Sequence, residues 1–402
     1  MSERTYYPNL NGLRAIGAFI VVSCHLSLMW LMWGVDVPQL FPIPGKVGVA
    51  LFFALSGFLI TSLLFVEQNK TGTIRLKAFY IRRILRIWPL YYLILLLGLF
   101  IFNRVPGLKI PVLSERMMHD LTWVNILSVL FIIPNFTHLF IPYTDQRWSI
   151  VVEEMFYLVQ PALVRTFRNK YFLIVLFCGI LFSSDIVSGL LHALHLDRKL
   201  SPAASIAILR QLEYLACIAI GCIFTALYKL RPDLCKRYLF NRWVQFGILL
   251  PLAALCAISF IKGKEEYFDL RLYSFLFGIL VLNAALNPST IFRLENPVLN
   301  FLGKISYGIY MYHMFCLGIA FVIVRHWMNP GLPQVLIYII LGIGLTITVS
   351  WLSFRYLESF FLGLNKPKKD KPAASPATPD HEPRLDPIPA NLPSDSIPYP
   401  EP

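Results

Sequence analysis

The chain has 402 residues, of which 56% are hydrophobic and only 15% are charged, and its formal net charge is +13. Soluble domains carry about 25% charged residues, so this composition, with a mean hydropathy of +0.61, excludes an ordinary water-soluble protein. The basic residues lie in short clusters between long apolar runs, which membrane orientation explains better than nucleic-acid binding does. The seven cysteines lie mostly inside apolar runs and indicate small core residues rather than a disulfide framework.

Ten apolar runs are long enough to cross a bilayer, because a hydrocarbon core of roughly 30 Å needs about 20 residues per helix. They lie at 12–33, 47–66, 86–102, 148–164, 171–190, 205–228, 243–261, 272–286, 298–324 and 334–361. A further run at 121–133 is short and precedes a proline, which predicts an interfacial or re-entrant helix. The first run is too long for a cleavable signal peptide. The sequence thus predicts an all-α, polytopic membrane protein with about ten transmembrane helices that enclose a catalytic cavity.

The basic residues predict the orientation of these helices. With the N-terminus inside, the inner segments as far as Lys371 carry 22 Lys and Arg residues and the outer segments carry 12. Positive residues favour the cytoplasmic side, so we expect a multi-pass protein of the cell (inner) membrane with both termini in the cytoplasm. The stretch 366–402 holds 11 of the 28 prolines and almost no aromatic residue. We therefore expect a membrane-embedded domain at 1–364 and a disordered, proline-rich cytoplasmic tail at 365–402.

Two ionisable side chains of the first run fall on one helix face. Arg14 and His25 are eleven residues apart, which places them within roughly 20° of each other, with His25 about 16 Å deeper in the membrane. Burial favours the neutral form of such a histidine, and a neutral imidazole can accept a proton from a hydroxyl. His25 is therefore a candidate general base. The alternative is a structural histidine that donates to a backbone carbonyl.

The fourth run carries two adjacent carboxylates, Glu153 and Glu154, which packing alone does not explain. Ser149, Glu153 and Tyr157 are spaced at i, i+4 and i+8 and form one polar stripe. We expect one carboxylate to orient the imidazole of His25 or to bind an acceptor hydroxyl. The other, about 100° around the helix, is expected to pair with an arginine of a neighbouring helix.

An arginine cluster opens the third run, where Arg82, Arg83 and Arg86 lie among aromatic residues such as Tyr80. Arg82 and Arg86 share a helix face, and Arg83 lies beside them. Guanidinium groups next to aromatic rings suit phosphates and an adenine ring on the cytoplasmic face. The alternative is ordinary anchoring of a helix at the inner boundary of the membrane.

In the ninth run, Ser306, Tyr310 and His313 lie on one face at i, i+4 and i+7. Tyrosines near a boundary commonly form an aromatic belt, but His313 lies deeper. The candidate substrate-binding residues are Ser149, Glu154, Tyr157, Tyr310 and His313. The chain shows no Cys/His cluster, phosphate loop or dinucleotide fingerprint, so we expect no metal site.

Five segments together resemble the acyltransferase-3 family of integral membrane acyltransferases, which includes bacterial polysaccharide O-acetyltransferases. The matching stretches are NLNGLRAIGAFIVVSCHL, FFALSGFLI, FYIRRILRIWPLYY, RWSIVVEEMFYLVQP and GKISYGIYMYHM. They occur in the order of the family and cover the chain from about residue 6 to residue 362. Each stretch alone is modestly specific, and the five in register are far more so.

The resemblance implies roles for particular residues. The arginine–ten residues–histidine motif of the family falls on Arg14 and His25, and this histidine is generally regarded as essential. The glutamate of its tryptophan–serine–glutamate motif falls on Glu153. A basic inner loop that is associated with the acyl-CoA donor maps to Arg82, Arg83 and Arg86.

The chain also departs from the family pattern. Asn11 and Ala50 stand where aspartate is frequent, and Met155 replaces a common glutamine. These positions bear on the choice of acceptor or donor more than on the reaction. No fused hydrolase-like outer domain is present in this sequence, although some relatives carry one.

The resulting expectation is transfer of an acyl group, most simply acetyl, from acyl-CoA to a hydroxyl of a surface or exported glycan or lipid-linked sugar. Acyl-CoA is expected as the donor substrate, and no cofactor is expected to stay bound. Direct transfer and an acyl-His25 intermediate both fit the residues. One alternative is a transporter or flippase for a lipid-linked glycan, without chemistry, although the chain shows no two-fold internal similarity. A membrane scaffold that recruits partners through its tail is a third possibility.

Overall fold

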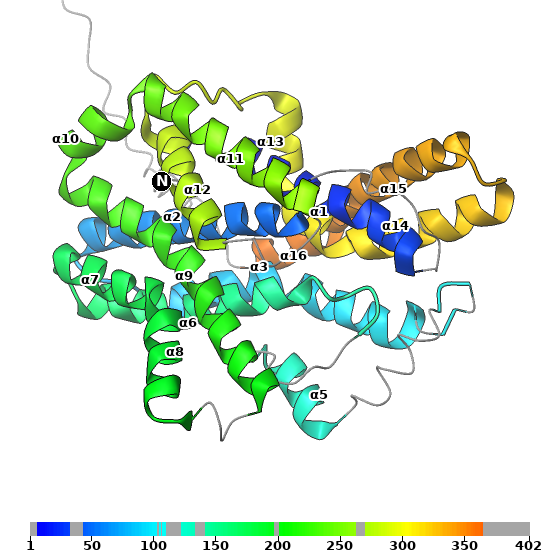
Figure 1. The fold of residues 1–402 in the computed structure, drawn as a ribbon, viewed down its shortest axis with the longest axis horizontal. Helices are drawn as coiled ribbons and strands as arrows, with labels where there is room; N and C mark the ends of the chain where they lie inside the picture. The colour runs from blue at the N-terminus through cyan, green and yellow to red at the C-terminus, as the bar shows by residue number, and fades with distance from the viewer. Residues whose placement is uncertain are drawn as a thin grey trace, which may run out of the picture. The chain divides into compact units, whose positions relative to one another are not determined.

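The computed structural model describes residues 6–32, 43–102, 104–105, 107–109, 122–132, 141–196, 201–262 and 270–364. These residues form helices and turns without a strand, which confirms the predicted all-α class (Figure 1). The helices in chain order are α1 (Leu10–Met32), α2 (Gly45–Thr71), α3 (Leu76–Leu96), η1 (Leu97–Phe102), α5 (Trp123–Leu130), α6 (Arg147–Thr166), α7 (Lys170–Leu181), α8 (Ser183–Ala193), α9 (Pro202–Leu230), α10 (Pro232–Leu234), η3 (Cys235–Leu239), α11 (Arg242–Lys262), α12 (Leu270–Leu286), α13 (Pro297–Lys304), α14 (Ser306–Trp327), α15 (Leu332–Ser353), η5 (Phe354–Glu358) and α16 (Ser359–Gly363). The predicted tail at 365–402 lies outside the described residues.

Within the described ranges, six helical segments are long and apolar enough to cross a membrane. They are α1, α2, α3 with η1, α9, α14, and α15 with η5 and α16. Two bent pairs, α7 with α8 and η3 with α11, raise this number to eight if each pair is one span. The predicted α6 span carries two glutamates and two arginines, and α12 has only 17 residues. A multi-pass membrane protein is supported, but the count of ten spans is not confirmed.

Side-chain caps and a glycine set several helix boundaries. Ser201, Asn169 and Asn296 accept hydrogen bonds from first-turn N–H groups of α9, α7 and α13, groups that otherwise lack a partner. At its C-terminal end, α2 is capped by Gly72, whose φ of +72° lies in the left-handed region that favours glycine. The turn at Gly72 leads directly into α3, the helix that carries the arginine cluster.

α2 lies inside the bundle and contacts α1, α6, α9 and α12 (Figure 1). Glycines allow its backbone to approach that of α9 closely. A Cβ atom on Gly57 would lie 2.0 Å from the carbonyl oxygen of Ile218, and one on Gly221 would lie 2.3 Å from that of Ala54. Small residues at helix interfaces permit such packing in membranes, where dispersion forces and hydrogen bonds hold helices together.

A second glycine contact fixes α2 against α1, because a Cβ atom on Gly48 would lie 2.5 Å from the carbonyl oxygen of Gly17. Buried polar side chains add to this packing. Gln160 of α6 donates to the Thr61 hydroxyl of α2 over 2.6 Å. The glycine contacts and this hydrogen bond together hold α2 to three of its neighbours.

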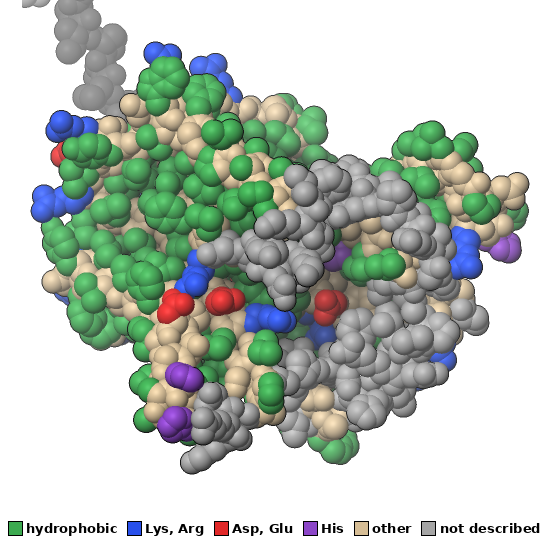
Figure 2. All heavy atoms as spheres, in the orientation of Figure 1, with side chains coloured by type: hydrophobic (Ala, Val, Ile, Leu, Met, Phe, Trp, Pro, Cys, Tyr) green, Lys and Arg blue, Asp and Glu red, His purple; other side chains and the backbone are tan. Residues whose placement is uncertain are grey.

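Large hydrophobic side chains cover much of the face over α9, α11 and α12, and Lys and Arg gather at its edge near α10 (Figure 2). Leu250 and Trp243 of α11 are among the most exposed, at 75% and 73%. Such contiguous apolar surface is rare on soluble proteins and suits contact with lipid. All seven cysteines are free thiols, as the sequence predicts.

We predict that Gly57→Ala and Gly221→Ala each destabilise the protein, because the added methyl group meets backbone atoms of the facing helix. Overpacking of this kind costs about 1–3 kcal/mol. The measurement is the thermal unfolding midpoint of the detergent-purified protein. Gly179→Ala is the matched control, since nothing lies within 4 Å of its Cβ position. Equal midpoints for all three variants would contradict the close approach of α2 and α9.

Candidate functional site

A polar cavity of about 80 Å³ lies among α1, α2, α3, α6 and α14. Cations, one carboxylate, hydroxyls and aromatic rings line it, namely Arg14, Phe52, Phe53, Ser56, Arg83, Arg86, Ser149, Glu153, Tyr157, Ser306, Tyr307 and Tyr310, together with aliphatic residues. A water molecule takes about 30 Å³ of the liquid, so the cavity holds the volume of a few waters. It therefore admits a small chemical group rather than a whole nucleotide-sized ligand, which needs about 300 Å³ or more.

Two larger grooves lie on either side of Ile20 on α1 and measure about 560 and 290 Å³. Almost all of their lining side chains are apolar, so neither groove offers groups for catalysis. Grooves of this composition suit the hydrocarbon chains of lipids. The polar cavity is therefore the candidate active site.

Arg14, Arg83 and Arg86 form the basic end of the cavity. The Arg83 guanidinium lies 4.7 Å from the ring centroid of Tyr157 and 5.6 Å from that of Phe79, so cation–π contacts position it. Arg86 is exposed and Arg14 is half-buried. The three positive charges act on one another, and an anion between them would relieve their repulsion.

Glu153 stands beside this basic end. Its Oε1 accepts a hydrogen bond from the Ser56 hydroxyl over 2.9 Å, and its Oε2 accepts one from the Tyr157 hydroxyl over 3.3 Å. The charges of Arg14 and Arg83 also act on this carboxylate. Hydroxyls and cations therefore satisfy a charge that would be costly inside a membrane. In the described structure the hydrogen bonds of Glu153 go to Ser56 and Tyr157 rather than to His25.

Ser149 and Tyr310 form the hydroxyl end of the cavity. Ser149 lies one turn from Glu153 on α6, about 6 Å further from Tyr157 and hence from Arg83. Its hydroxyl is 2.7 Å from that of Tyr310, and both hydroxyls can donate to the Gln146 carbonyl, over 3.3 and 3.1 Å. The predicted stripe of Ser149, Glu153 and Tyr157 thus lines the cavity from one end to the other.

His25 and His313 do not line the cavity. Their ring centroids lie 4.9 Å apart, and the ring of His313 lies 6.0 Å from that of Tyr310. Nδ1 of His25 is 2.7 Å from the carbonyl oxygen of Val21, which is the contact that the structural alternative predicts. That contact uses only one ring nitrogen and leaves Nε2 as the nitrogen for chemistry. The two histidines adjoin the hydroxyl end through Tyr310.

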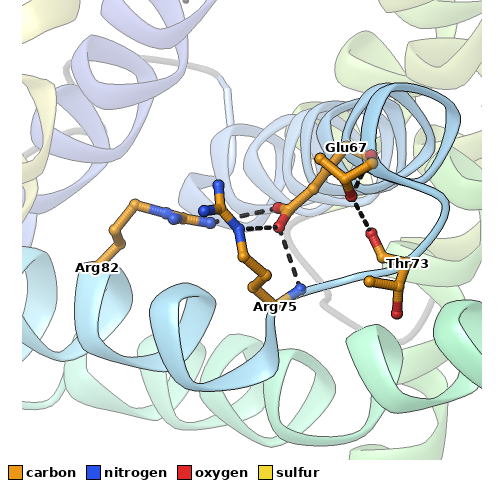
Figure 3. A network of polar contacts seen from close by, with 5 residues as sticks. Glu67, Thr73, Arg75 and Arg82 are labelled. Carbon is orange, nitrogen blue, oxygen red and sulfur yellow. Dashed lines mark hydrogen bonds and ion pairs between the residues drawn. The ribbon is translucent and has the colours of Figure 1, made fainter.

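Besides His313, three predicted binding residues lie outside the cavity lining. Arg82 points to Glu67, which also accepts from Arg75 (Figure 3). Tyr80 donates to the Leu158 carbonyl over 2.7 Å. Arg82 therefore fits the anchoring alternative, and the pair that reaches the cavity is Arg83 and Arg86. Residues at i and i+3 also share a helix face, so the sequence alone did not separate these two choices.

The third of them, Glu154, accepts a hydrogen bond from the indole of Trp88 over 3.1 Å. Its other oxygen is buried without a hydrogen-bond partner in the described structure. The hydrogen bond of this carboxylate is thus to an indole rather than to an arginine, although the charge of Arg83 also acts on it. Glu154 lies beside the site rather than in its wall.

The sequence analysis missed Ser56, Tyr307 and Glu358. Ser56 and Tyr307 line the cavity, and both lie within the segments that carry the family resemblance. Glu358 of η5 is buried and its charge acts on Arg86. The rule that singles out carboxylates within apolar runs should have identified Glu358, since the tenth run includes it.

The described residues contain no group of three or more side chains that could hold a metal ion. The arginines can hold an anionic group, the hydroxyls can donate to a developing negative charge, and the imidazoles can accept a proton.

Comparisons with known proteins give the same family as the sequence motifs. Residues 7–355 match the profile of the acyltransferase domain of the acyltransferase-3 family. O-acetyltransferase OatA of Staphylococcus aureus (strain NCTC 8325 / PS 47) is 29% identical over 369 residues, which cover 89% of this chain and 58% of the relative. A protein of Staphylococcus aureus (strain COL), named provisionally as an O-acetyltransferase, is 29% identical over 384 residues, or 89% of this chain and 57% of the relative.

The chain thus spans a little over half the length of these relatives. No solved structure matches it. The family profile covers the helices that build the cavity, from α1 to α15. On that match, the chain belongs to the acyltransferase-3 family of membrane acyltransferases.

Proposed function

We propose that this chain transfers an acyl group, most simply acetyl, from acyl-CoA to a hydroxyl of a surface or exported glycan. The observation that carries the proposal is that one cavity, lined by helices, has cations at one end and paired hydroxyls at the other. The phosphates of a thioester donor suit the cationic end, and the hydroxyl of an alcohol acceptor suits the end with paired hydroxyls. The relatives in Staphylococcus aureus, OatA among them, are named as O-acetyltransferases, which supports the transfer of acetyl to oxygen.

The donor binds at the basic end. Coenzyme A carries several phosphate charges, and guanidinium groups bind phosphates through paired, charge-assisted hydrogen bonds. Arg86 is exposed and Arg83 is held by its aromatic neighbours, so both can meet phosphates without a large rearrangement. The small volume of the cavity suits entry of only the thioester end, while the nucleotide stays outside.

Transfer takes place at the hydroxyl end. The acceptor oxygen attacks the thioester carbonyl, the carbon–sulfur bond breaks, and the acceptor proton passes to Nε2 of His25 and then to the coenzyme A thiolate. Ser149 and Tyr310, whose hydroxyls lie 2.7 Å apart, would turn from the Gln146 carbonyl to donate to the thioester oxygen as negative charge develops on it. Glu153 lies nearer the arginines and fits a role in holding Tyr157 and Arg83 in place.

The distribution of basic residues supports a donor that comes from the cytoplasm. The inner segments carry more Lys and Arg than the outer ones, which favours cytoplasmic termini and a donor site open to the cytoplasm. The acceptor then arrives from the opposite face of the cell membrane. A sugar hydroxyl, alone or on a lipid carrier, is the acceptor that this arrangement suits.

We predict that purified protein in lipid nanodiscs transfers label from radioactive acetyl-CoA to a glycan acceptor, and that His25→Ala abolishes this transfer. Loss of the base should lower the rate by a factor of about 10² or more. His326→Ala is the control, because that histidine is exposed at the end of α14. Mass spectrometry identifies the ester. A pure transporter would give no labelled ester with any variant, and an active His25→Ala enzyme would remove His25 from the mechanism.

We predict that Arg86→Ala raises the KM for acetyl-CoA by about 10-fold or more, since a hydrogen bond to a charged group is worth about 1.5–3 kcal/mol. Arg82→Ala is the matched control on the same helix, because Arg82 contacts Glu67 outside the cavity. Steady-state kinetics at varied acetyl-CoA concentrations measure the effect. An equal rise of KM in both variants would point to the surface charge of α3 rather than to the cavity.

A further inference from the structure

Two imidazole rings from distant parts of the sequence meet beside the cavity. His25 of α1 and His313 of α14 have ring centroids 4.9 Å apart with an angle of 56° between the rings. The two helices pack directly on each other. Packing of α1 against α14 does not require an imidazole on each helix at this contact, because apolar side chains would fill the same space.

Backbone carbonyls fix how both rings are protonated. Nδ1 of His25 lies 2.7 Å from the Val21 carbonyl oxygen, and Nδ1 of His313 lies 2.7 Å from the Tyr310 carbonyl oxygen. A carbonyl oxygen only accepts, so each Nδ1 carries a hydrogen and donates it. In the neutral ring the remaining nitrogen, Nε2, is then a lone-pair acceptor. The pair therefore offers two acceptors and no second donor of its own.

In the resting structure, the acceptor nitrogen Nε2 of His313 receives no hydrogen bond from the described residues. The side chain is fully buried. An unsatisfied buried acceptor costs about 1–3 kcal/mol. A leucine or phenylalanine at this position would avoid that cost. The presence of a histidine instead suggests that its Nε2 accepts a hydrogen bond or a proton during the reaction.

Tyr310 connects this nitrogen to the cavity. Its carbonyl holds His313, while its hydroxyl contacts Ser149 at the hydroxyl end. The two ring centroids of Tyr310 and His313 are 6.0 Å apart. His313 thus neighbours both the candidate base His25 and the end of the cavity where an acceptor alcohol would stand.

We propose that His313 is the partner of His25 in proton transfer, so that the imidazole pair takes up the one proton released by the acceptor hydroxyl. The inference rests on the proposed function. The acceptor O–H bond breaks as the new oxygen–carbon bond forms, and the proton is held by the imidazole pair. The pair then returns it to the sulfur of coenzyme A as the carbon–sulfur bond breaks, which leaves both rings neutral for the next cycle.

His313→Asn tests the role of the ring nitrogen. The asparagine amide can replace the Nδ1–H donor toward the Tyr310 carbonyl, but it cannot accept a proton near neutral pH. We expect kcat to fall by about 10-fold or more, with the KM for acetyl-CoA changed by less than about twofold. The matched control is His326→Asn on the same helix, which should keep wild-type kinetics. A kcat for His313→Asn within about twofold of wild type would overturn the proposal.

A second measurement does not depend on activity. Nitrogen NMR of histidine-labelled protein follows both rings as the pH is lowered, and a shared proton requires that they respond together in one step. The titratable side chains that face the pair include Tyr310, whose ring lies beside that of His313, and Asp145 before α6, whose charge acts on His25. Cys24 of α1 lies with His25 against Gly45 of α2. In the His25→Asn variant, the response of His313 should move to a different pH. If His25 titrates while His313 stays unchanged, the pair does not share a proton, whatever the enzyme acylates.

Discussion

The cost of placing charge inside a membrane shapes the whole site. Arg14, Arg83 and Arg86 come from two helices, and the carboxylate of Glu153 comes from a third. Each would be expensive alone in hydrocarbon, so the helices that carry them must meet and share the same polar space. Ser56 and Tyr157 complete the arrangement by hydrogen bonding to Glu153. The cavity is therefore the place where these helices can satisfy their polar groups together.

Helix packing supplies the precision that this meeting needs. Gly57 and Gly221 bring α2 and α9 into backbone contact, and Gly17 and Gly48 do the same for α1 and α2. The close approach sets α1 and α2 at the depth where Ser56 reaches Glu153. Side chains that form the site are thus positioned by residues that have no polar side chain at all.

Periodicity predicted the residues that lie on one helix and failed where two helices had to be compared. The stripe of Ser149, Glu153 and Tyr157 follows from spacing alone, and all three line the cavity. The choice between Arg82 and Arg83 depended on the rotation of α3 about its axis, which the neighbours Glu67 and Tyr157 determine. The contact of Glu153 with Ser56 likewise depended on α2, and no pattern within α6 contains that information.

The sequence predicted where membrane-spanning helices lie along the chain, whereas the predicted number of ten spans is not confirmed. Length and apolarity identify helices such as α2 and α14, whereas α6 carries the charges of the site and α12 is short. A functional helix in a membrane is atypical because its polar residues serve the site rather than the lipid. The same residues that reveal the function therefore weaken the signal by which a span is recognised.

The glycine contacts have a mechanical consequence for the cavity. Backbone atoms that already touch cannot move closer, so α2 forms a rigid wall with α1 and α9. Widening of the cavity falls to its other walls. α3 contains Pro89 and continues into the π-helical turn η1, two features at which helices bend readily. α3 therefore has two positions at which it can bend, and Arg83 and Arg86 precede both of them.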